Sequence, residues 1–201
     1  KAEIPKLDSD SPILSITSEV ESPIVEGLKF VNESPVKLVA QGFTDDLKAI
    51  GQGRLSLELK IPLEDLEASK FKGAYYVTNG TIFANPEIGL PELVKINGVL
   101  NFTENSLSTQ NISTEILGGP AQLSFRSGED KIIRVNAHGK LTDLGLKKVA
   151  SNLLIDNMQG SAEWTSEIVI KKPMIDLSLR SNLVGMAILL PPPSAVSYTH
   201  L

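Results

Sequence analysis

The feature that most limits the fold of this chain is an alternation of apolar and polar residues that recurs along most of its length. In GRLSLELKIPL, residues 53–63, every second side chain from Leu55 to Leu63 is apolar, whereas Glu58 and Lys60 between them are charged. Because successive side chains of a β-strand point to opposite faces, this spacing predicts a strand with one apolar face. The same alternation recurs in residues 95–102, 121–125, 133–141, 160–170 and 174–183.

Short turn-like segments separate these stretches, among them TENS at 103–106 and RSGED at 126–130. Consecutive strands joined in this way pair as an antiparallel meander, so we predict a mainly β fold. The alternation changes parity between Leu107 and Ile112, and such a change predicts a β-bulge there.

The segment STEILGGPAQLSF, residues 113–125, carries a double glycine and a proline between two strand-like halves. Gly118 and Gly119 can adopt backbone angles closed to other residues, and Pro120 disfavours a helix before it. We therefore predict a sharp bend, a corner of the sheet, at these three residues. A phosphate-binding loop is disfavoured because neither a Lys-Ser/Thr pair nor a helix pattern follows.

Helical periodicity is convincing in one place, TDLGLKKVASNLL at 142–154, which predicts a short helix near 143–154 with Thr142 or Asp143 as N-cap. A weaker candidate for a single turn is PLEDLEASK at 62–70. The expected apolar stripe of the longer helix consists of Leu144, Leu146, Val149, Leu153 and Leu154.

Three portions are predicted along the chain. Residues 1–50 are expected to be irregular, with prolines punctuating short edge-like strands such as PILSI and VKLVA, and residues 51–190 to form the sheet. Within the sheet portion, LVGMAILL at 183–190 is expected to be a buried strand, since it is too short to span a bilayer. Residues 191–201 are Pro-rich, and we expect a truncated or artefactual terminus on a piece of a longer protein.

Composition argues against several classes of function. The 201 residues carry a net charge of -5 without a dense Lys/Arg cluster, which disfavours nucleic-acid binding. The chain has no cysteine and two distant histidines, so disulfides, thiol chemistry and a histidine-rich metal site are not expected, and no cofactor is predicted. His138 should face solvent, and Glu129 with Asp130 lies in a turn, so no catalytic residue is assigned.

Several segments in order resemble the AsmA-like family of bacterial envelope proteins, over roughly residues 30–190. An ordered series is more specific than any single piece, since GGP alone would be weak. The segments are SPV at 34–36, LKIPL at 59–63, INGVLNF at 96–102 with TENSL at 103–107, LGGP at 117–120 and GSAEW at 160–164.

The resemblance implies the periplasmic portion of an inner-membrane-anchored protein, with the anchor outside these residues. Its fold would be an antiparallel sheet curled into a repeating β-groove, and Gly118, Gly119 and Pro120 would let the curved sheet turn a corner. Such proteins are implicated in moving phospholipid from the inner to the outer membrane, without catalysis. The expected partners are acyl chains, and membrane components that other parts of the protein would contact.

With the alternating pattern, this resemblance selects the residues expected to line a lipid groove. They are Leu55, Leu57, Leu59, Ile61, Leu100, Phe102, Leu123, Phe125, Ile133, Val135 and Trp164.

Other readings of the same residues stay open. Alternation alone favours a β-sandwich whose leucines pack against a second sheet, and only the family resemblance reverses that preference. The chain would then be a non-catalytic envelope scaffold or a partner-binding β-module with a sealed apolar core. A hydrolase would require polar groups converging in a pocket, for which the sequence supplies no strong constellation.

Overall fold

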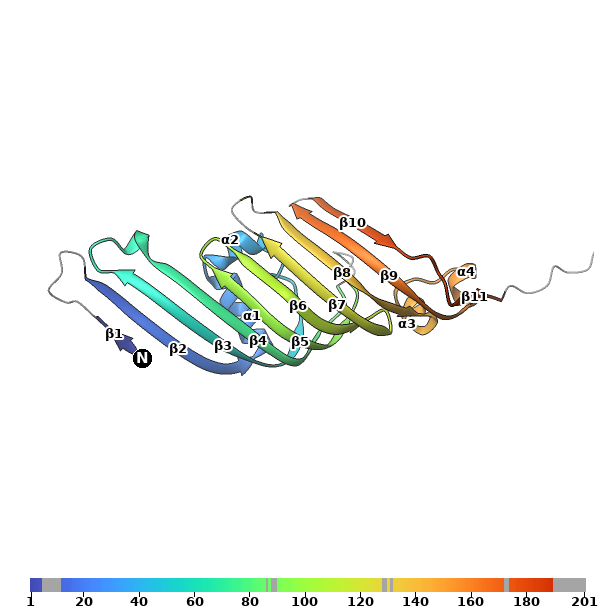
Figure 1. Ribbon diagram of the computed structural model, residues 1–201, viewed down its shortest axis with the longest axis horizontal. Helices are drawn as coiled ribbons and strands as arrows, with labels where there is room; N and C mark the ends of the chain where they lie inside the picture. The colour runs from blue at the N-terminus through green and yellow to red at the C-terminus, as the bar shows by residue number, and fades with distance from the viewer. Residues whose placement is uncertain are drawn as a thin grey trace, which may run out of the picture.

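The computed structural model describes residues 1–4, 12–85, 87, 90–127, 130, 132–171 and 174–189. These residues form one antiparallel sheet of 11 strands, ordered β1 to β10 as in the sequence, with β11 pairing β9 (Figure 1). The sheet is not closed into a barrel, and the predicted mainly β meander is confirmed. The strands are β1 Ala2–Glu3, β2 Ile13–Pro23, β3 Ala49–Pro62, β4 Lys70–Ile82, β5 Leu93–Thr103, β6 Leu107–Ile116, β7 Gly119–Ser127, β8 Ile133–Thr142, β9 Met158–Lys171, β10 Met174–Arg180 and β11 Met186–Ile188.

The strand register places the alternating apolar residues of neighbouring strands opposite one another. Leu55 of β3 pairs with Val20 of β2 and with Tyr75 of β4, which in turn pairs with Leu100 of β5. Directly paired residues of antiparallel strands share a face. We call this side the apolar face, which comprises Leu14, Ile16, Val20, Leu55, Leu57, Leu59, Ile61, Phe71, Tyr75, Val77, Leu100, Phe102, Leu107, Ile112, Ile116, Ala121, Leu123, Phe125, Ile133, Val135, Ala137, Leu141, Ala162, Trp164, Ile168, Ile170, Ile175, Leu177 and Leu179.

A β-bulge in β6 keeps that strand in phase with the face. Thr109 pairs with Phe125 and Ile112 with Leu123, and the register shifts between these two pairs. The bulge predicted between Leu107 and Ile112 is therefore confirmed. Without the extra residue, the second half of β6 would turn its apolar side chains to the opposite face.

The glycines before Pro120 form a hairpin turn, and not the corner of a bent sheet that we expected. Leu117 and Gly118, with φ of 54° and 81°, are the two loop residues that join β6 to β7. Such two-residue turns need positive φ at both positions, which Gly118 adopts without strain. The first turn of the helix that begins at Asp143 packs on this hairpin turn, because a Cβ on Gly145 would lie 1.8 Å from the Leu117 carbonyl oxygen.

The helices differ more from expectation than the strands do. Thr142 is confirmed as an N-cap, since its hydroxyl accepts a hydrogen bond from the Gly145 N–H. The predicted single helix is instead two, α3 Asp143–Val149 and α4 Leu153–Asp156, and the described residues also form a 3-10 turn at Leu66–Ala68, where a single turn was expected. Most of the expected apolar stripe is exposed: Leu144, Val149, Leu153 and Leu154.

Residues 13–40 are mostly regular, contrary to the prediction of short strands and loops, whereas residues 41–48 form turns and irregular structure. PILSI belongs to the 11-residue strand β2, and VKLVA forms helix α2 Val36–Ala40, which follows helix α1 Ile24–Glu33. Pro23 and Pro35 flank these helices at their N-terminal ends, where proline is tolerated because its missing N–H costs no intrahelical bond. Strand β4 was also not predicted.

The C-terminal apolar run is not the buried strand that we expected. Of its described residues, 183–189, only Met186–Ile188 forms a strand, β11, and the side chains of Leu183, Val184, Ile188 and Leu189 are exposed. The predicted terminal portion, residues 191–201, lies outside the described residues.

Two apolar clusters stabilise the fold, and the larger one lies between the apolar face and the α1–α2 pair (Figure 1). It joins Ile24, Val31, Val36 and Val39 of the helices to Tyr75, Phe102 and Leu107 of the sheet. The Tyr75 ring is packed between two backbones, because a Cβ on Gly27 of α1 would lie 2.8 Å from it and a Cβ on Gly53 of β3 only 2.4 Å. Two glycines therefore make room for one aromatic ring under the helix.

We expect Gly53→Ala to destabilise the protein by about 1–3 kcal/mol, the usual effect of overpacking a filled core. Urea denaturation of the wild type and the variant measures this difference in the free energy of unfolding. In a Tyr75→Leu background the same change should cost much less, because the ring that the new methyl would strike is gone. An equal cost in both backgrounds would contradict the packing of Tyr75 against Gly53.

Candidate functional site

All residues predicted to line a groove lie on the apolar face. Leu55, for example, is aligned with Leu100 through Tyr75, and Phe125 is paired with Val135. Their common placement follows from the strand register. A role of these residues in lipid contact stays a prediction.

The centre of the apolar face is covered by the two N-terminal helices. Phe102 is only 3% exposed, and its ring centroid lies 5.6 Å from that of Phe30 in α1 and 6.3 Å from that of Phe71. Four further predicted lining residues are partly buried against the same cluster, so this region is a closed core. They are Leu55, Leu57, Leu100 and Phe125.

Few polar contacts attach the helices to the sheet. The Ser127 hydroxyl of β7 donates a buried hydrogen bond of 3.1 Å to the Val39 carbonyl oxygen. The Tyr75 hydroxyl lies 3.3 Å from the carbonyl oxygens of both Ser22 and Pro23, at the start of α1. Burial raises the pKa of the Tyr75 hydroxyl, and the hydrogen bond to Ser22 offsets part of that rise.

The apolar face is uncovered at its C-terminal end. On β10, Ile175, Leu177 and Leu179 are 41%, 60% and 50% exposed, although they belong to the same face as the buried residues of β9. Leu59 and Ile61 of β3 are half-buried and lie outside both apolar clusters. The face is thus part closed core and part accessible apolar surface.

Trp164 of β9 belongs to the second cluster, with Leu93, Ile96, Ile116 and Leu141. It pairs directly with Gly139 of β8, so its ring meets no opposing side chain on that strand. Of the other predicted lining residues, Leu123 packs against this cluster and Ile133 is buried, whereas Val135 is half-buried.

The opposite face of the sheet is polar and carries ion pairs between strands. Glu58 of β3 contacts Lys72 of β4 at 2.9 Å and Lys60 at 3.5 Å. The hydrogen bond from Lys72 is the main reason that the pKa of Glu58 lies below its ordinary value. These pairs are exposed, so they orient the side chains more than they stabilise the fold.

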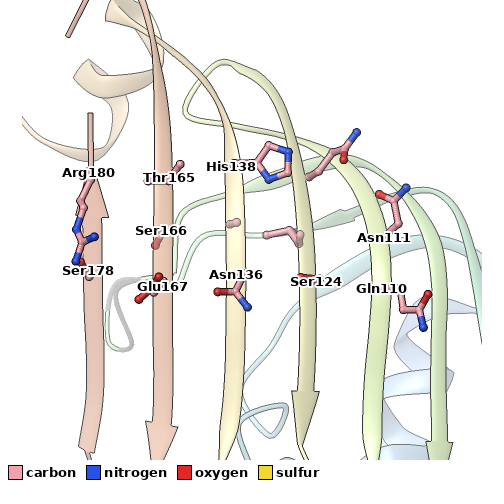
Figure 2. A pocket seen from close by; sticks show the side chains of 13 residues that line it. Gln110, Asn111, Ser124, Asn136, His138, Thr165, Ser166, Glu167, Ser178 and Arg180 are labelled. Atoms are coloured by element: carbon pink, nitrogen blue, oxygen red, sulfur yellow. The ribbon is translucent and has the colours of Figure 1, made fainter. Parts of the chain in front are cut away.

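A shallow depression of about 300 Å³ lies on the polar face of β6 to β10, and Figure 2 shows its side chains. His138 is exposed there, as predicted. Neither His138 nor Glu167 makes a side-chain hydrogen bond within the described ranges, so no base is positioned on a nucleophile. The depression is lined by Gln110, Asn111, Gln122, Ser124, Asn136, His138, Thr165, Glu167, Ser178 and Arg180, and also by Leu123, Ala137 and Ser166, which the strand register places on the apolar face.

The acidic turn at residues 129 and 130 has a structural explanation in its described half. The Asp130 carboxylate accepts a hydrogen bond from the Ile132 N–H and forms an ion pair of 2.8 Å with Arg134, and both interactions lower the pKa of Asp130. Glu129 lies outside the described residues. Among the residues that are described, no group of three or more His, Asp or Glu side chains is arranged to hold a metal ion.

Within the described ranges, no helix has both the length and the apolar composition needed to cross a bilayer. The family model of the YhdP protein matches residues 1–199, nearly the whole chain. The chain belongs to the YhdP family. No curated protein and no solved structure matches it.

Membership in the YhdP family indicates a bacterial envelope protein. It is also consistent with a role in lipid transport. In this YhdP-family chain, the only extensive surface that brings together the residues singled out from the sequence is the apolar face, within the part that the structure describes. The candidate site is therefore this face, and above all its uncovered portion on β10.

Two features of the candidate site in this YhdP-family chain were not predicted from the sequence. The cover formed by α1 and α2 was not predicted, although Ile24, Leu28 and Val31 follow the i, i+4, i+7 spacing of an apolar helix stripe. Leu177 and Leu179 were placed on an alternating strand but not proposed as lining residues, and they are the more exposed positions.

The raised pKa of Tyr75 predicts a loss of stability in alkali. A tyrosine whose pKa is higher in the folded state binds its proton longer there than in the unfolded chain, so the free energy of unfolding falls as pH rises from about 10 through the folded pKa. Compared with Tyr75→Phe, which lacks this titration, the wild type should lose more stability between pH 9 and 11.5 in urea denaturation. Parallel pH profiles for the two proteins would contradict the burial of the hydroxyl.

Proposed function

We propose that this chain is a segment of an inner-membrane-anchored periplasmic bridge, and that phospholipid moves from the inner to the outer membrane along its apolar face. Acyl chains would lie on that face, and head groups would stay toward water. The components at the two membranes would be contacted by parts of the protein outside these residues. The bridge needs no catalyst, because lipid movement along a surface breaks no covalent bond.

The energetic reason for such a surface is the cost of moving a lipid through water. Exposing each CH₂ group costs about 0.8 kcal/mol, so an acyl chain that leaves a membrane needs an apolar surface for its whole path. A strand of alternating residues offers one apolar side chain about every 6.7 Å. Neighbouring strands about 4.8 Å apart extend this surface sideways.

The observation that carries the proposal is the uncovered apolar surface of β10. Ile175, Leu177 and Leu179 continue a face that is buried at its centre, yet each is at least 41% exposed. Three large apolar side chains in a row on one strand are unfavourable in water unless they have an apolar partner. Acyl chains are the partner that fits best, because membership in the YhdP family is consistent with lipid transport.

A non-catalytic scaffold or partner-binding β-module is the second candidate. It is favoured by the closed core under α1 and α2, where Phe102 has almost no exposed surface. In that case the side chains of β10 would bind protein and no lipid would be found on the sheet.

We expect a photo-crosslinking amino acid at Leu177 to form adducts with labelled phospholipid in cells. The matched control is Asp176, the preceding residue, whose side chain lies on the polar face and should form none. A third position, Phe102, should also form none, because α1 covers it. No adduct at Leu177 in a folded protein would favour the scaffold.

A charge on the uncovered part of the apolar face should obstruct the movement of lipid along that face without unfolding the protein. Leu177→Asp places the carboxylate at a position that is 60% exposed, so stability should change by less than about 1 kcal/mol while lipid adducts at Leu179 fall several-fold. Ser178→Asp on the polar face should leave the adducts unchanged. Phe102→Asp should instead unfold the domain, because it would bury an unpaired charge.

A further inference from the structure

Three buried polar side-chain atoms make no hydrogen bond within the described part of the chain. They are Thr109 Oγ1, Trp164 Nε1 and Ser166 Oγ, in residues that are 3%, 4% and 6% exposed. All three residues lie on the apolar face, on β6 and β9. Nearly all buried polar groups in folded proteins are paired, so each such atom calls for a specific explanation.

Trp164 and Ser166 are neighbours two residues apart on one strand, so their side chains leave the same face about 6.7 Å apart. The indole Nε1–H only donates a hydrogen bond, and the serine hydroxyl can donate one as well. The pair therefore suits a ligand that presents hydrogen-bond acceptors to an otherwise apolar surface.

The surroundings of this pair select an uncharged acceptor. The residues in register with Ser166 are Ala137 on β8 and Leu179 on β10, and Trp164 is opposite Gly139. None of them carries a charge that could balance a phosphate, and Arg180, the next residue of β10, is paired with Thr165 on the polar face. Desolvating an anion at this place without a cation would be unfavourable, so a phospholipid head group does not fit there.

The ester carbonyl groups of a diacyl lipid have the required chemistry. They are strong uncharged acceptors that are attached directly to acyl chains. Ser166 is paired with Leu179, which is 50% exposed, so the open apolar surface begins one strand away from the unpaired hydroxyl. An acyl chain lying on β10 would bring its ester group to the edge of β9.

Access to the pair requires movement of elements that pack against the Trp164 cluster, because both polar atoms are buried. Leu146 of α3 and Met186 of β11 pack against the cluster that contains Trp164. Helix α3 has 7 residues and β11 has 3, whereas Leu93 and Ile96 of the same cluster belong to the 11-residue strand β5.

We propose that Trp164 Nε1–H and the Ser166 hydroxyl form a binding site for the ester carbonyls of a diacyl lipid on the apolar face. This inference rests on the proposed function, because it names the chemical group that the lipid surface recognises. It makes the face selective for acyl esters over chains without a carbonyl.

The experiment uses Trp164 as a reporter, since it is the sole tryptophan of the 201-residue chain. The chain is titrated with phosphatidylglycerol vesicles whose two chains carry 9,10-dibromo groups, once with ester-linked chains and once with ether-linked chains of the same length. Bromine quenches tryptophan fluorescence at short range, so quenching reports lipid near Trp164 for both linkages. The ester lipid should reach half-maximal quenching at a roughly five-fold lower concentration, the effect of about one net hydrogen bond.

In Ser166→Ala, the ratio of the ether-lipid to the ester-lipid concentration at half-maximal quenching should fall toward one. Thr165→Ala, which changes the adjacent residue on the polar face, should retain the roughly five-fold ratio. Equal quenching by the two lipids would overturn the ester site and leave lipid binding itself intact. No quenching by either lipid in a chain folded by circular dichroism would overturn both proposals. If Ser166→Ala does not fold, the ratio of the two lipid concentrations measured for the wild type decides by itself whether the face prefers ester-linked chains.

Discussion

The structure depends on the pairing register of its antiparallel strands. A shift of one residue in any strand would move all its apolar side chains to the polar face, so the register is specified wherever one face is buried. Here the same phase is kept from β2 to β10, with the bulge between Thr109 and Ile112 restoring it inside β6. The core, the uncovered leucines and the unpaired donors on which the two proposals rest all lie on the face that this register defines.

A single sheet that is stable and also binds acyl chains must cover part of its apolar face and leave part of it open. The α1–α2 pair covers the centre, where Tyr75 and Phe102 are packed beneath it. The side chains of β10 stay uncovered. Burial under the helices supplies stability, because each large apolar side chain contributes about 1.5–3 kcal/mol when fully buried. The open strand then carries no large share of that stability, which leaves it available for a ligand.

The parts of the fold that follow from local periodicity could be predicted from the sequence. Alternation identified most strands and assigned every nominated side chain to its face, because strand geometry depends on neighbours two residues apart. The helix cover could not be derived with the same ease, since prolines at 23 and 35 suggest breaks as readily as helix starts. Gly118 shows the same limit: positive φ suits both a corner and a hairpin, and only the pairing of Ile116 with Gly119 across the turn distinguishes them. The exposure of Leu177 depends on which elements cover β10, and periodicity carries no information about that.

The unpaired donors of β9 are the feature that would separate the proposed lipid surface from an ordinary core. In a core that only stabilises the fold, replacing Ser166 by alanine or valine would remove an unsatisfied hydroxyl at no loss, so a buried hydroxyl there has no structural advantage. A surface that acts on amphipathic molecules differs, because its ligand brings both acyl chains and carbonyl groups. Donors set one strand behind an open apolar edge would hold a lipid at a defined depth, with the chains on β10 and the charged head group beyond the uncharged zone. A purely apolar face would bind the chains equally well at every depth, and the polar atoms on this face therefore point to recognition of the ester region.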